Sequence, residues 1–103
     1  MEIPIADVAD RWTILCLKHE HGQTVILELE RYGEELGKHN VDCAELSQIN
    51  EWMWEIEDKI TAATGYYEIG RLYKKLRDLT LKRVAAKNAI AREHGGVIEE
   101  KTY

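Results

Sequence analysis

The side chains of this chain that are best suited to chemistry form an aromatic and basic set in its second half. A Trp or Tyr ring can stack on a nucleobase, and an Arg can pair with a phosphate, so together they are typical of nucleotide pockets. In the alternative interpretation, the same rings close a contact between subunits. The candidate ligand-binding residues are Asn50, Trp54, Arg71, Tyr73, Arg77, Arg83 and Lys87.

Positive charge is concentrated in the same part of the chain. Residues 1–68 carry 15 acidic and 5 basic side chains, whereas residues 69–103 carry 4 acidic and 9 basic ones. This division predicts either a basic helix packed beside acidic helices or a surface that faces a phosphate-bearing ligand. The overall charge of −5 opposes binding to duplex DNA or RNA, so we expect no duplex nucleic acid as a partner.

Catalytic and metal-binding patterns are weak. Glu51, Glu55 and Asp58 share one side of a predicted helix, and Glu55-x-x-Asp58 resembles half of the Mg²⁺ site of all-α nucleotide pyrophosphatases of the MazG type. The E-x-x-E element of those enzymes is missing, so a solvated acidic face is the favoured interpretation. No phosphate loop or nucleophile turn is found. We therefore expect a protein that is not an enzyme and has no metal or cofactor, with a Mg²⁺-dependent hydrolase as an alternative.

Apolar residues recur at three- and four-residue spacing, which predicts an all-α protein with three long helices. The first stripe begins at Ile5 and continues through Gly22 to Leu36, so we expect one helix with a possible bend at Gly22. Asp42 can cap the second helix, and Gly95 can end the third. The expected helices span about 4–38, 42–64 and 66–93, with a tail at 95–103, in a single domain 1–103.

The short turn at residues 64–66 predicts that the second and third helices form an antiparallel hairpin. Three slender helices leave apolar faces uncovered, so we expect self-association to complete the bundle as a homo-oligomer. Arg83 lies on the apolar stripe of the third helix. A charge at such a position reaches solvent, an acidic partner or a ligand.

Membrane and secretory features are not found. No apolar run approaches the roughly 18 residues of a membrane span, and the acidic N-terminal stretch does not resemble a signal peptide. Two cysteines, Cys16 and Cys43, suit a reducing compartment. We expect a cytoplasmic protein with no membrane partner.

Three stretches resemble a family of short helical bacterial and phage proteins that is classed as a domain of unknown function. They are Asp10-Arg11-Trp12-Thr13-Ile14-Leu15 with Lys18, the run from Asn50 to Ile60, and Glu99-Glu100-Lys101-Thr102-Tyr103. Together they cover about a third of the chain. The resemblance implies an all-helical protein in a bacterial or phage setting, and it implies no activity.

The leading hypothesis is a non-enzymatic, oligomeric binding protein for a small anionic ligand of nucleotide type. A phage protein that sequesters a cyclic nucleotide signal, and so protects the phage from host defence, would be one example. The main alternative is a structural or adaptor protein whose helices pair with themselves or with another protein.

Overall fold

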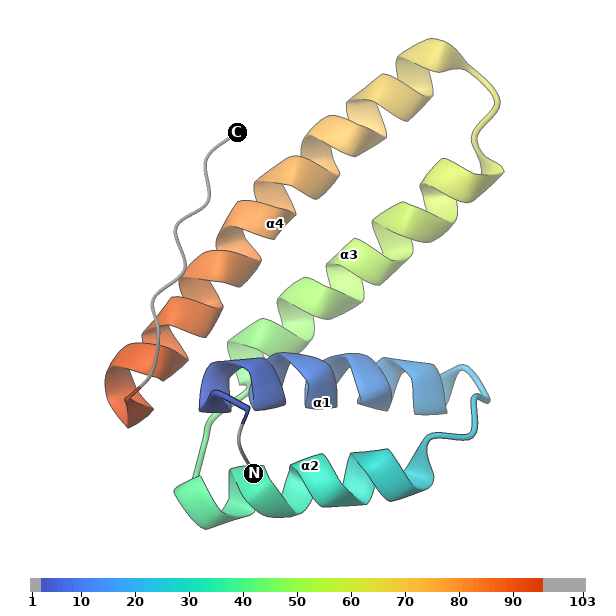
Figure 1. The fold of residues 1–103 in the computed structure, drawn as a ribbon. Helices are drawn as coiled ribbons and strands as arrows, with labels where there is room; N and C mark the ends of the chain where they lie inside the picture. Colours follow the sequence, from blue (N-terminus) through green and yellow to red (C-terminus); the bar gives the residue numbers. More distant parts are fainter. Residues whose placement is uncertain (1–2, 96–103) are drawn as a thin grey trace.

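The computed structural model describes residues 3–95, and within this range the chain forms four α-helices and no strand (Figure 1). The predicted all-α class is confirmed. The helices are α1 (Ile5–Glu20), α2 (Ile26–His39), α3 (Ala44–Ala62) and α4 (Tyr66–His94). Within the described range, none of them is both long and apolar enough to cross a membrane. Of the predicted tail, only Gly95 lies among the described residues, as the C-cap of α4.

The predicted long helix 4–38 is wrong, because the chain turns back after α1 and forms two helices there. The Gly22 N–H donates to the His19 carbonyl and the Gln23 N–H to the Lys18 carbonyl, both at 3.0 Å. This pair of bonds is the Schellman motif that closes a helix C-terminus. It requires a left-handed residue, and Gly22 has φ +83°. The apolar repeat continues through Gly22 because both helices bury a stripe at the same spacing.

The same motif ends α2 at Asn40, a left-handed residue with φ 53°. The Val41 N–H donates to the Leu36 carbonyl at 3.3 Å, and both side chains pack in the core. Two residues later the Asp42 carboxylate accepts a bond from the Ala44 N–H at 3.0 Å. The helix that the sequence predicts from Asp42 begins at Ala44 in the structure, and Cys43 rather than Asp42 is its N-cap.

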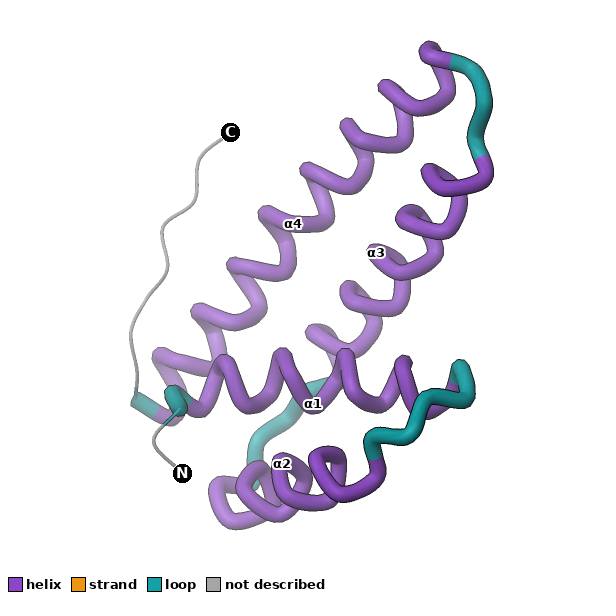
Figure 2. Tube along the Cα trace, turned by 45° about the vertical axis from the view of Figure 1, so that its right-hand side comes forward, coloured by secondary structure: helices purple, strands orange, loops and turns teal. Residues whose placement is uncertain are grey.

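The helices form two antiparallel hairpins, α1–α2 and α3–α4. The second is the predicted hairpin. Helix α1 lies across α3 and α4 near the end of the hairpin where α3 begins and α4 ends, and α2 covers the far side of α1 (Figures 1 and 2). The other end of the hairpin, residues 58–79, extends beyond α1 and α2 and is called the arm. The molecule is accordingly elongated, at 46 × 33 × 20 Å.

The core lies where the two hairpins cross. Small side chains on α1 and α4 allow close helix approach there, and branched side chains from α3 and α4 fill the remaining space. Its members include Val8, Ala9, Leu46, Ile49, Ala86, Ile90 and Ala91. In the arm, Leu72 is also buried, at 2% exposure. The core thus fixes α1 on the hairpin.

Candidate functional site

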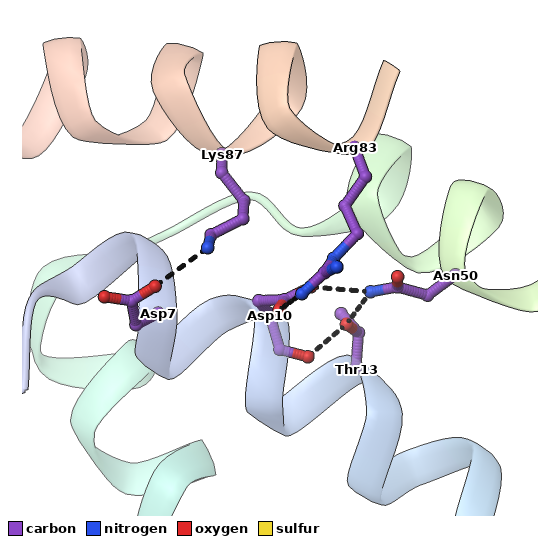
Figure 3. Close-up of polar contacts among 6 residues, drawn as sticks. All are labelled: Asp7, Asp10, Thr13, Asn50, Arg83 and Lys87. Atoms are coloured by element: carbon purple, nitrogen blue, oxygen red, sulfur yellow. Dashed lines mark hydrogen bonds and ion pairs between the residues drawn. The ribbon is translucent and has the colours of Figure 1, made fainter. Parts of the chain in front are cut away.

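A buried carboxylate on α1 joins three helices. Arg83 of α4 donates from Nε to Asp10 Oδ1 at 2.9 Å, and its Nη2 donates to Asp10 Oδ2 (Figure 3). Asn50 of α3 donates from Nδ2 to Asp10 Oδ1 at 3.0 Å. The planar guanidinium matches the two carboxylate oxygens, so this two-point pairing fixes the orientation of both groups. Of the three possibilities predicted for Arg83, namely solvent, an acidic partner or a ligand, the structure shows an acidic partner, Asp10.

Thr13 completes this network from the next turn of α1. Its hydroxyl accepts a bond from Asn50 Nδ2 at 2.8 Å and donates to the Asp10 carbonyl at 2.8 Å. Thr13 is only 1% exposed. Among the described residues, no buried side-chain nitrogen or oxygen lacks a hydrogen-bond partner. The interior therefore satisfies the polar groups that it buries, as a stable network requires.

A second ion pair lies one helical turn away. Lys87 of α4 places Nζ 2.8 Å from Asp7 Oδ1 on α1, and Lys87 is 7% exposed (Figure 3). Asp7 and Asp10 are three residues apart on α1, and Arg83 and Lys87 are four residues apart on α4. Residues at these spacings lie on one face of a helix, so both ion pairs lie between the same two faces. Part of the basic stretch of α4 is therefore used to hold α1 in place.

The pKa of Asp10 is lowered from its ordinary value of 3.8. Burial is the largest single influence, and it raises the pKa. The hydrogen bonds from Arg83 and Asn50, with the charges of Arg83 and Lys87, together outweigh burial. Asp10 is therefore an anion at neutral pH and holds the guanidinium of Arg83 in position.

A cavity of about 280 Å³ adjoins this network and is shared by α1, α3 and α4. Its lining includes Leu17, Lys18, Asn50, Trp54, Glu57 and Arg83. The Trp54 ring packs against His21, with ring centroids 4.7 Å apart and planes inclined by 33°. His21 is oriented by a bond from Nδ1–H to the Leu17 carbonyl at 2.7 Å. One wall of the cavity is thus a positioned aromatic ring.

The residues predicted from the sequence divide into two groups. Asn50, Trp54 and Arg83 line one cavity, and Lys87 is paired beside it. The other three are exposed on the arm and do not line that cavity: Arg71, Tyr73 and Arg77. Arg71 donates to Glu68 at 2.7 Å, and that contact raises the pKa of Arg71.

Sequence reasoning did not assign Asp10, Thr13, Lys18 or His21 to the site. The sequence does contain a pattern that could have identified Asp10. Ile14 follows Asp10 by four residues and Leu17 follows Ile14 by three, so the three residues lie on one face of α1. An acidic residue on an apolar stripe is the counterpart of Arg83 on the stripe of α4. Matching the two would have predicted the ion pair.

The acidic residues considered for Mg²⁺, Glu51, Glu55 and Asp58, are all exposed on α3. Within the part of the chain that the structure describes, no three His, Cys, Asp or Glu side chains are grouped so that they could hold a metal ion. The hydrolase alternative gains no support from this arrangement.

Comparison of the chain with family models, with curated proteins and with solved structures gives no match. The resemblance to a family of bacterial and phage proteins therefore stays a prediction. Its terminal element at residues 99–103 lies outside the described residues.

Proposed function

We propose that this protein is a non-enzymatic binding protein for a small, planar, anionic ligand of nucleotide type, held in the cavity beside Trp54. One observation carries the proposal. Three of the candidate ligand-binding residues of the sequence, Asn50, Trp54 and Arg83, line the same cavity.

Four side chains of the cavity have distinct parts in the proposed binding: Lys18, Asn50, Trp54 and Arg83. The face of the Trp54 ring stacks on a nucleobase, while Lys18 and Arg83 attract the phosphate. Asp10 and Asn50 hold Arg83 in one orientation before the ligand arrives. A side chain that is already ordered loses little entropy on binding, so this arrangement favours affinity.

The size of the cavity restricts the ligand. Pockets for small molecules typically measure about 300–1,000 Å³, and this cavity of about 280 Å³ lies just below that range. It suits a nucleoside monophosphate, linear or cyclic, better than a dinucleotide. If the protein sequesters a nucleotide signal, we therefore propose that the signal is a mononucleotide.

Isothermal titration with linear and cyclic nucleoside monophosphates tests the proposal. We expect Trp54→Leu to weaken binding at least tenfold, because stacking on the indole is lost. Trp52→Ser is the matched control, since Trp52 lies two residues away on α3 and does not line this cavity. Absence of binding at about 100 µM ligand would contradict the proposal.

The adaptor alternative is favoured by a separate observation. Arg71, Arg83 and Lys87 are each paired with an acidic side chain of the same chain, and Tyr66 and Tyr67 are exposed at the tip of the arm. Exposed aromatic rings at a tip suit a protein contact. Replacing both tyrosines with Ser would abolish such a contact and leave nucleotide titrations unchanged.

A further inference from the structure

The face of the α3–α4 hairpin that points away from α1 carries an exposed tryptophan between two hollows. Trp52 is 45% exposed, and it lines both hollows. At about 100° per residue, it is roughly 200° around α3 from Asn50, which faces α1. The lining of both hollows comes from α3 and α4 alone. This surface, called the Trp52 face, is therefore separate from the cavity beside Trp54.

The two hollows combine apolar and charged side chains. The larger hollow, of about 470 Å³, is lined by the apolar Ile49 and Ala85 together with the charged Glu45 and Lys82. The smaller, of about 280 Å³, is lined by Ile56 and Leu79 together with charged groups. Trp52 thus stands as a projection beside a hollow that can receive an aromatic side chain.

We infer that the Trp52 face binds a second copy of this chain across a two-fold axis. In a two-fold interface, the same patch meets itself, so each copy must offer both a projection and a hollow. The Trp52 face offers both side by side. The Trp52 ring of each copy inserts into the larger hollow of the other and covers the exposed Ala85 there.

Charge selects a second copy as the occupant and also fixes its orientation. The α3 side of the two hollows carries Glu45 and Glu55, and the α4 side carries Lys75 and Lys82 with one acidic residue, Asp78. When α4 of the second copy lies against α3 of the first, the two-fold axis also places α3 of the second copy against α4 of the first. Glutamates then face lysines in both contacts. The opposite placement would juxtapose like charges, which is unfavourable.

The dimensions of the face set the expected size of the interface. Helix α3 has 19 residues and is about 28 Å long, and two helices side by side span about 20 Å. The face thus offers about 550 Å² per copy, so the interface would bury about 1,100 Å² in total. This is just above the roughly 1,000 Å² of a specific interface.

Sedimentation equilibrium of the full chain over a range of concentrations tests the inference. We expect a monomer–dimer equilibrium, and Trp52→Ser should raise its dissociation constant at least tenfold. Trp54→Leu is the matched control and should leave the equilibrium unchanged. Circular dichroism establishes that each variant is folded.

Charge reversal provides a second test that does not alter Trp52. One variant carries Lys75→Glu and Lys82→Glu, and the other carries Glu45→Lys and Glu55→Lys. Each should be monomeric alone, because α3 and α4 of the two copies then repel. An equimolar mixture restores opposite charges at every contact and should form a heterodimer.

Four results would overturn the inference. They are a wild-type chain that is monomeric at all concentrations, an assembly that Trp52→Ser leaves intact, an assembly that is not a dimer, and charge-reversed variants that do not combine when mixed. None of these results bears on nucleotide binding beside Trp54, so the two proposals stand or fall separately.

Discussion

Replacing Asp10 with Asn removes the negative charge at the centre of the network while keeping the size of the side chain. Arg83 then loses its counter-ion, and an amide NH₂ faces the N–H groups of Arg83 or Asn50. Removing one partner of a buried ion pair typically costs about 3–5 kcal/mol. Because the Arg83 side chain is 27% exposed, water relieves part of the cost, and we expect about 3 kcal/mol.

Urea unfolding at pH 7, followed by circular dichroism, measures this change. A domain of about 100 residues has a free energy of unfolding of about 5–15 kcal/mol, so Asp10→Asn should remain folded in buffer. With a urea dependence of about 1–3 kcal/mol per molar, the midpoint should fall by about 1–3 M. Asp58→Asn, an exposed change of the same kind on α3, is the control and should leave the midpoint unchanged.

The pH dependence of unfolding gives a second readout of the same side chain. The pKa of Asp10 is lower in the folded state than its ordinary value of 3.8. Its contribution to stability is therefore fully present above about pH 4 and is lost as the pH falls through the lowered pKa. Asp10→Asn should remove that part of the acid destabilisation.

A double replacement tests whether the ion pair as a whole stabilises the fold, or whether the cost of Asp10→Asn comes only from leaving Arg83 without its counter-ion. Asp10→Leu with Arg83→Met replaces both charges with apolar groups, and we expect it to cost less than Asp10→Asn alone. A loss below about 1 kcal/mol for Asp10→Asn, together with an unchanged acid profile, would refute the reasoning.

Four further changes are expected to act through backbone and packing, and urea unfolding measures each of them. Gly22→Ala should cost about 1–2 kcal/mol, because a side chain is strained at φ +83°. Gly70→Ala should stabilise α4 by about 0.5–1 kcal/mol, because the new methyl group meets nothing within 4 Å. Gly33→Ala should stabilise the protein less, because its methyl group would lie 3.2 Å from Trp12 Nε1. Leu72→Ala should cost about 2–5 kcal/mol by leaving a cavity in the arm, and a cost below 1 kcal/mol would show that the arm adds little to stability.

The sequence predicted the α3–α4 hairpin well because its signals are local. The Asp42 carboxylate accepts a bond from the Ala44 N–H just before the first turn of α3, and Gly95 with φ +78° ends α4. The break between α1 and α2 was not predicted, because the same glycine can be tolerated inside a helix or can end it. Backbone bonds at Gly22 decide between these outcomes, and the apolar spacing on both sides of Gly22 is compatible with either.

The candidate site was predicted in part for a related reason. Arg83 was conspicuous as a charge on an apolar stripe, but its partner Asp10 is 73 residues away in the chain. Which residues of α1 face α4 depends on how the two hairpins cross, and this is a property of tertiary packing. For the same reason, spacing along α4 alone could not separate Arg83 at the cavity from Arg77 on the arm.

The division of the fold into two hairpins also determines the order in which it can assemble. Each hairpin joins helices that are adjacent in the chain, so each can close early and at a small loss of loop entropy. The contact between Asp10 and Arg83 closes a loop of 73 residues, and on the ribosome Arg83 is synthesised only after both α1 and α2 are complete. We therefore expect Asp10 to stay hydrated until the finished hairpins dock, and its burial to belong to that last step.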